Sequence, residues 1–186
     1  MKHIKLLAML CIFTASPVLA QESPEPLRRH SLFVEFGGNG GYYSFNYDRI
    51  MLAKPKWKMS ARVGAMYYRE SLSYMEDGNQ NLLTIPVELS YLRGAGNHHL
   101  ELGLGVTALY ERYQDFEGSD ITQLMGLPTA RVGYRYQKRE GGFFFKTGLT
   151  PMLQIKGSQY KYNKAQGILW AGIAFGYTLK DQRNRR

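Results

Sequence analysis

Alternation of apolar and polar residues recurs along most of this chain. In the stretch Gly142–Lys156, GFFFKTGLTPMLQIK, mostly apolar side chains occupy every second position from Phe145 to Leu153, and small, polar or charged side chains lie between them. Successive side chains of a β-strand point to opposite faces of the sheet. The pattern therefore predicts a strand with one apolar face and one polar face, with a cluster of three aromatic residues at its first end.

Seven further stretches of similar alternation predict seven more strands. The eight predicted strands are Ser31–Gly37, Tyr42–Met51, Trp57–Tyr68, Asn81–Leu92, His98–Tyr110, Leu124–Gln137, Gly142–Lys156 and Gly167–Leu179. Short connections alternate with three long polar segments, 69–80, 111–123 and 157–166. Short turns at one end and longer loops at the other are typical of outer-membrane barrels. The pattern favours an all-β fold, an eight-stranded antiparallel up-and-down transmembrane β-barrel.

Two kinds of local irregularity are expected in this barrel. The first outer connection, Gly37–Gly41, is short, and its GGNGG sequence predicts a tight turn because glycine and asparagine tolerate positive φ. Proline cannot donate a hydrogen bond to a strand ladder. We therefore expect a bulge or a missing bond at Pro86, and similar breaks at Pro128 and Pro151.

Ionisable side chains gather on the polar face of the predicted strands. A lipid-facing Arg or Lys near the bilayer midplane costs ~2–4 kcal/mol, so this face is predicted to line the lumen. Eight strands enclose just enough room for side chains to fill it, and buried charges need partners. We expect a filled lumen whose charge network comprises Glu35, Asp48, Arg62, Glu88, Glu101, Arg131, Arg135 and Lys146. The alternative is a narrow anion path lined by the three arginines.

Aromatic residues lie near the ends of the predicted strands. Such residues form girdles at the two membrane interfaces, and the expected girdle comprises Trp57, Tyr67, Tyr91, Tyr110, Tyr134, Phe143 and Tyr177. The alternative is a soluble, lipocalin-like barrel with the apolar face inside. That face carries too many Tyr and Leu side chains for so small an interior, so the membrane arrangement is favoured.

The first 20 residues are typical of a secretory signal peptide, with Lys2 and Lys5 beside an apolar run and a small-residue cleavage site ending at Ala20. We expect a signal peptide at 1–20, a flexible leader at 21–30, the barrel at 31–179 and a basic periplasmic tail at 180–186. Cys11 is the single cysteine, so the exported chain has no disulfide framework. Export, with a net charge of +9 spread over turns and tail, argues against a nucleic-acid partner.

Residues suited to catalysis are scarce. The mature chain holds three histidines: His30 lies in the leader, and His98 and His99 lie at a short turn on the predicted periplasmic side. No histidine falls in an outer loop, where barrel enzymes place a general base. Loop serines such as Ser71, Ser73 and Ser119 have no partner in the pattern. We expect no enzymatic activity, no catalytic residue, no metal site and no cofactor.

Six segments carry a family resemblance: GGNGGYYSFNYDR, LTIPVELSYL, HHLELGLGV, GYRYQ, GGFFFKTGLTP and GIAFGYTL. They resemble a family of small outer-membrane β-barrel proteins of Bacteroidetes bacteria and, more loosely, porin-like and OmpA/OmpX-type barrels. The resemblance covers most of residues 31–179 and implies location and fold, with little chemistry.

The pattern and the resemblance together lead to one expected function and two alternatives. We expect a monomeric integral outer-membrane barrel with a structural or surface-interaction role through its external loops. Its expected partners are outer-membrane lipid, the barrel assembly machinery and an external ligand of unknown identity. The alternatives are a lipid- or small-ligand-handling outer-membrane barrel, which could be enzymatic, and a soluble periplasmic ligand-binding barrel.

Overall fold

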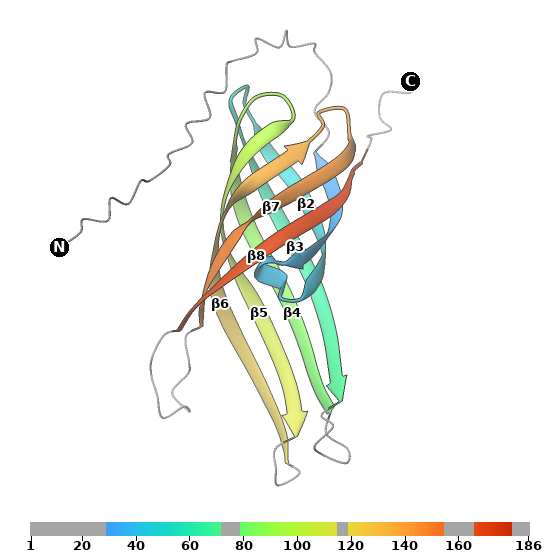
Figure 1. Cartoon of the computed structure of the whole chain (residues 1–186), viewed down its shortest axis with the longest axis vertical. Coiled ribbons are helices and arrows are strands. Elements are labelled where there is room, and N and C mark those ends of the chain that lie inside the picture. The colour runs from blue at the N-terminus through green and yellow to red at the C-terminus, as the bar shows by residue number, and fades with distance from the viewer. Residues whose placement is uncertain (1–28, 72–78, 115–118, 155–165, 180–186) are drawn as a thin grey trace, which may run out of the picture.

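The computed structural model describes residues 29–71, 79–114, 119–154 and 166–179 (Figure 1). The predicted signal peptide and basic tail, and all but the end of the predicted leader, lie outside these residues. The eight strands are β1 (His30–Gly37), β2 (Tyr43–Ala53), β3 (Trp57–Ser71), β4 (Asn79–Arg93), β5 (His98–Gln114), β6 (Asp120–Gln137), β7 (Gly142–Gln154) and β8 (Gln166–Thr178). Each pairs antiparallel with its neighbour in sequence, and β8 pairs with β1. The predicted closed, eight-stranded antiparallel barrel is confirmed.

The long outer hairpins differ from the expected boundaries. The segment 111–123 was expected to be a loop, but β5 and β6 stay paired as far as Gln114 and Asp120. Likewise, β3 and β4 stay paired as far as Ser71 and Asn79. The loop prediction was wrong here because these strand ends are mostly polar on both faces, so they lack the alternation that marks the rest of the strands. At the other end, His30 belongs to β1 rather than to the leader.

The alternation along the strands separates two environments. Large apolar side chains point outward and are exposed, as at Phe45 (64%), Leu104 (72%) and Leu124 (75%). Most inward positions are buried and many are polar or charged. A soluble protein buries its apolar face, so this barrel is inverted relative to a soluble one. Within the described residues, no helix has the length and hydropathy to cross a membrane.

The β1–β2 connection does not lie at the outer rim. Gly38–Gly40 form η1, one turn of 3-10 helix that is buried in the barrel interior and contacts strands on several sides. Figure 1 shows η1 about halfway along the barrel, while β3 to β6 extend well past it. Gly37 (φ 73°), Gly38 (φ 71°) and Gly41 (φ 96°) adopt the positive φ that this bend requires. The turn is tight, as expected, but its expected place at the outer rim was wrong.

The expected breaks in the ladders occur at Pro86 and Pro151, whereas Pro128 pairs with Val106 in an unbroken β5–β6 ladder, so no break interrupts that ladder at Pro128. The β3–β4 ladder has no pairs opposite Ile85 and Pro86, although the register is the same on both sides of the break. The β6–β7 ladder is interrupted between Thr129 and Val132, where Pro151 lies on β7. One further irregularity was not expected: the β2–β3 register shifts between Ile50 and Leu52, which leaves Met51 as a bulge.

Candidate functional site: the barrel lumen

All eight residues of the predicted charge network point into the barrel. They come from every strand except β8, and the structure buries each of them to 3% exposure or less: Glu35, Asp48, Arg62, Glu88, Glu101, Arg131, Arg135 and Lys146. At the depth of this network, strand β8 supplies small residues at its inward positions, Gly172, Ala174 and Gly176. A Cβ at Gly172 would lie 3.1 Å from the Glu35 carboxylate, so β8 leaves the space that the charged side chains occupy.

Two arginines and two glutamates form the first cluster. The Arg62 guanidinium lies 2.7 Å from Glu35 and 3.6 Å from Glu88. Arg131 lies 2.7 Å from the other Glu35 oxygen and 3.2 Å from Glu88. Each carboxylate therefore faces two cations. This sharing helps to offset the free-energy cost of removing the charges from water. An isolated buried ion pair offsets that cost less well.

Lys146 and Arg135 extend the cluster toward the end of the barrel that carries the short turns. Lys146 Nζ lies 3.7 Å from Glu88 and 3.1 Å from Glu101. Arg135 holds Asp48 through both of its terminal nitrogens, lies 3.8 Å from Glu101 and also donates to Ser60 at 3.1 Å. The eight charged side chains thus form one connected network of four acids and four bases, which we call the inner lumen.

Two phenylalanines lie within the inner lumen among these charges. Phe33 and Phe144 stack at 4.9 Å between ring centroids and are buried. Lys146 Nζ lies 5.1 Å from the Phe33 centroid, and the Arg135 guanidinium carbon lies 4.8 Å from that of Phe144. Desolvated cations over aromatic faces gain about 2 kcal/mol or more. The rings therefore fill the lumen without leaving the cations in an apolar environment.

Sequence reasoning missed Asn39, which ties the buried turn η1 to the network. Its amide nitrogen donates to Glu88 at 2.9 Å, and its amide oxygen accepts from Arg62. The backbone carbonyls of the turn are also occupied: Thr107 donates to that of Asn39 at 2.7 Å, and Thr84 to that of Gly40 at 2.6 Å. An asparagine within a glycine-rich turn carries no sequence signal for such a position.

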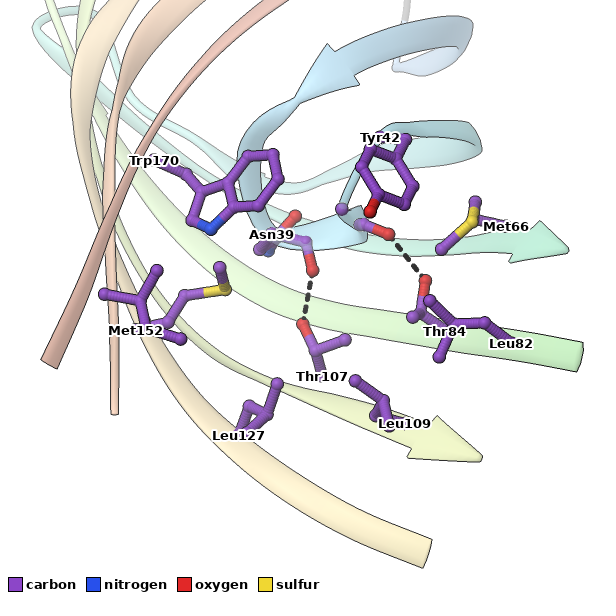
Figure 2. Close-up of a pocket in the computed structure, with 13 residues that line it drawn as sticks. Asn39, Tyr42, Met66, Leu82, Thr84, Thr107, Leu109, Leu127, Met152 and Trp170 are labelled. Atoms are coloured by element: carbon purple, nitrogen blue, oxygen red, sulfur yellow. Dashed lines mark hydrogen bonds between the residues drawn. The ribbon is translucent and has the colours of Figure 1, made fainter. Parts of the chain in front are cut away.

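Beyond η1, the lumen changes character. A cavity of about 170 Å³ lies between the turn and the long-loop end of the barrel (Figure 2). Its floor is Asn39–Gly41, and its walls are mostly apolar: Tyr42, Met66, Leu82, Leu109, Leu127, Met152, Ile168 and Trp170, with Thr84 and Thr107 beside the floor. We call this region the outer lumen. The lumen was expected to be filled throughout, so the cavity departs from that expectation.

The three histidines of the described residues each have a different polar partner. His30 and His98 each approach a tyrosine hydroxyl, of Tyr47 and Tyr134 respectively, at 2.6 Å on the outer face. His99 points inward, where its Nε2 lies 2.6 Å from the Lys58 ammonium. In the part of the chain that the structure describes, no three His, Cys, Asp or Glu side chains are grouped as a metal site would require.

The predicted girdle residues all lie on the outer face of the strands. Tyr67 and Tyr110 lie toward the long-loop end, and the other five lie toward the short-turn end: Trp57, Tyr91, Tyr134, Phe143 and Tyr177. Several pack against aromatic neighbours, as Trp57 does against Tyr91 at 6.0 Å between ring centroids. The loop serines of the sequence analysis give no site: Ser119 is exposed, and the side chains of Ser71 and Ser73 lie outside the described residues.

Solved structures share this fold at low sequence identity. The chain is similar to Ail, the attachment invasion locus protein of Yersinia pestis, solved in complex with the heparin analogue sucrose octasulfate, with 11% identity, a TM-score of 0.51 and coverage of 80% of this chain and 97% of that chain. It is also similar to the N-terminal β-barrel domain of Pseudomonas aeruginosa OprF, with 15% identity, a TM-score of 0.46 and coverage of 80% and 97%.

Comparison of the sequence with known proteins does not assign the chain to a family. No protein-family model matches the chain, and no curated protein matches it. At 11% identity, the likeness to Ail concerns the fold alone. The function must therefore be argued from the distribution of side chains in the barrel.

Proposed function

We propose that the chain is an integral outer-membrane β-barrel with a filled inner lumen and a structural or surface-interaction role at its long-loop end. The observation that carries this proposal is the inversion of polarity: large apolar side chains are exposed around the barrel while eight charged ones are buried inside it. Exposing that apolar surface to water would be unfavourable, whereas lipid would cover it. The aromatic outer face and the sequence resemblance to small barrels of Bacteroidetes bacteria support the same placement.

Cell fractionation combined with gel migration tests the membrane placement. We expect the protein in the outer-membrane fraction, with a folded band on an unheated denaturing gel that shifts after boiling. Recovery in the soluble periplasmic fraction would contradict the proposal and favour the soluble ligand-binding alternative.

We infer that the inner lumen is a plug rather than an anion path. Arg62, Arg131 and Arg135 each face carboxylates, so none presents a free positive charge to a passing anion. Purified protein in planar bilayers is expected to show no steady conductance. A stable anion-selective conductance that disappears in Arg131→Met, in a variant that still shifts on heating, would favour the path.

The surface role rests on the outer hairpins. Strands β3 to β6 extend past η1 and end in polar, exposed positions such as Arg69, Arg112 and Asp120. Replacing 72–78 and 115–118 by short turns is expected to leave the heat-dependent gel shift intact while removing attachment of whole cells to surfaces. Unchanged attachment would argue against a role for these two hairpins.

A second candidate function, the handling of a lipid or another small ligand, is favoured by one observation, the apolar cavity of the outer lumen. A lumen lined by polar atoms alone would offer no such apolar site.

A further inference from the structure

Polar groups of Asn39 and Gly40 at the floor of the outer lumen are already hydrogen-bonded within the protein. The Asn39 and Gly40 carbonyls already accept from Thr107 and Thr84, and the Asn39 side chain is held by Glu88 and Arg62. The walls above this floor are mostly apolar. A water molecule needs two to four polar partners to be retained in a cavity. The site therefore suits an apolar group.

The size of the cavity limits that group. Its volume is about 170 Å³. An engineered cavity of ~150 Å³ lined by Leu, Ile and Phe stays dry and binds benzene. The outer lumen can thus hold a group of about six carbon atoms, which excludes a whole lipid but admits the end of a hydrocarbon chain.

The barrel wall is interrupted beside this cavity. Pairing of β1 with β8 stops at Gly37 and Gly172, although β8 begins at Gln166. Pairing of β2 with β3 stops at Phe45 and Ala65, although β3 runs to Ser71. Beyond the ends of β1 and β2, the described chain has no strand between β3 and β8, as the front of Figure 1 shows.

Three aromatic rings stand in this interruption. The Tyr42 ring lies 5.1 Å from that of Tyr68 on β3 and 6.2 Å from that of Trp170 on β8, measured between centroids. Tyr42 and Trp170 also line the cavity (Figure 2). Since both rings belong to the cavity and to the interruption, the cavity reaches the side of the barrel at this place.

The outer face beside the interruption is apolar. Tyr67 on β3 is 55% exposed, and Leu169 on β8 is 67% exposed. The neighbouring outward residues Ala65 and Ala171 are small and exposed. In the proposed membrane placement these residues face hydrocarbon, so the molecules present in greatest number at the opening are lipid acyl chains.

We propose that the outer lumen binds the end of a lipid acyl chain that reaches it from the membrane through the interruption between β3 and β8. This proposal rests on the outer-membrane placement argued above. The site supplies apolar contact on its walls, and its floor, Asn39–Gly41, stops the chain where the Asn39 and Gly40 carbonyls are already bonded to Thr107 and Thr84. Tyr42, between Tyr68 and Trp170, partly closes the opening.

The two tryptophans allow the proposal and the placement to be tested separately. The chain holds only Trp57, on the outer face, and Trp170, at the cavity. Trp57→Phe leaves Trp170 as the single fluorophore, and Trp170→Phe leaves Trp57. Each variant is reconstituted into phosphatidylcholine vesicles with plain acyl chains or with acyl chains brominated near the terminal methyl or near the headgroup. Bromine quenches a tryptophan that it approaches.

The expected result is quenching of Trp170 by the terminally brominated chains, and its loss when the cavity is filled. Leu109→Phe on β5 and Ile168→Phe on β8 fill the cavity from opposite walls, each in the Trp57→Phe background. Leu104→Phe is the matched control, because it adds the same ring on the outward face of β5, where Leu104 is 72% exposed. It should leave the quenching unchanged. Two filling variants guard against one that does not fold, as judged by the heat-dependent gel shift.

Three outcomes overturn a part of the argument. Quenching of Trp57 by chains brominated near the headgroup, with no quenching of Trp170 by either lipid, would overturn the chain site and leave the membrane placement standing. Quenching of Trp170 that persists in both filled variants would come from lipid outside the barrel, and would also overturn the site. Absence of quenching for both tryptophans would overturn the membrane placement itself.

Discussion

The inner and outer lumen are enclosed by the same strands, yet they are filled in opposite ways. In the inner lumen, eight charged side chains and two stacked phenylalanines are buried together, and each of these charges faces an opposite one. In the outer lumen, apolar side chains surround a cavity of about 170 Å³. Along β6 the inward positions change from Arg135 and Arg131 to Leu127. The change occurs at the depth of the buried turn η1.

This difference shows what divides the barrel. Alternation assigns a side chain to the inside or the outside, but the β1–β2 turn decides where along the axis the interior changes. Asn39 closes the charged region by bonding Glu88 and Arg62, and its carbonyl closes the apolar region through Thr107. The two halves can therefore be perturbed separately.

Removal of one cation from the inner lumen should have the largest effect. Arg62→Met leaves Glu35 and Glu88 buried with one fewer partner each. Loss of one partner of a buried pair costs about 3–5 kcal/mol. We expect a decrease of that size in the free energy of unfolding, measured by urea titration of the detergent-solubilised barrel.

Arg69→Met is the matched control for this change. Arg69 lies on the same strand, at an exposed position near the outer end of β3. Its replacement should change the free energy of unfolding by at most about 0.5 kcal/mol. Equal effects of the two substitutions would mean that the inner lumen does not depend on its charge pairing.

Loss of the Asn39 side chain should have the next largest effect, because this residue joins the two halves. Asn39→Ala removes the bonds to Glu88 and Arg62 but keeps the backbone carbonyls. A buried group left without its partner costs about 1–3 kcal/mol. We expect a decrease in unfolding free energy of that size and faster hydrogen exchange of the Gly38–Gly40 amides.

Asn81→Ala provides the comparison for Asn39→Ala. The Asn81 amide oxygen accepts a hydrogen bond from the exposed Tyr67 hydroxyl at the outer rim, at 2.8 Å. Its loss should cost less than that of Asn39 and leave the exchange of η1 unchanged. Unchanged exchange of η1 in Asn39→Ala as well would show that the turn is held by its backbone bonds alone.

The sequence allowed the barrel and its two faces to be predicted, because both follow from a period of two. The alternation along each strand is enough to predict that Arg62, Glu88 and the other six charged residues point inward. Which charges meet could not be predicted, since Arg135 and Asp48 are 87 positions apart and come together only through the closure of the barrel. Balance of charge indicated mutual neutralisation, but not its geometry.

The outer lumen could not be predicted for a different reason. Met66, Leu82 and Leu127 occupy inward positions and line the cavity. The alternation of side chains predicts which residues point inward, but it does not predict where along the barrel axis the inward residues change from charged to apolar. The GGNGG turn is short enough for a hairpin at the rim, and its buried position depends on bonds to Thr84 and Thr107, far along the chain. The polar strand ends within 111–123 were missed because periodicity fades where both faces contact water.

A smaller effect is expected at the edge that the interruption leaves on β3. The Tyr43 hydroxyl donates to the Tyr67 carbonyl, beyond the last β2–β3 pair. Tyr43→Phe should therefore lower the free energy of unfolding by about 0.5–1.5 kcal/mol, the net worth of one hydrogen bond. Tyr110→Phe is the control, because the Tyr110 hydroxyl forms no hydrogen bond within the described residues. Equal unfolding midpoints for both variants would show that the β3 edge needs no cap.

The smallest effect is expected at the outer rim, where an arginine and a carboxylate also meet. Arg112 lies 2.6 Å from Asp120, as close as Arg62 lies to Glu35, but both side chains are about half exposed. Exposed pairs contribute about 0–1 kcal/mol and are screened by salt. Arg112→Met should therefore cost less than about 1 kcal/mol in unfolding free energy, and the loss should shrink as salt is raised.

The cost of Arg62→Met should persist in the same salt series, because its partners are buried. A cost for Arg112→Met that equals that of Arg62→Met at every salt concentration would mean that distance, rather than burial, sets the value of these pairs.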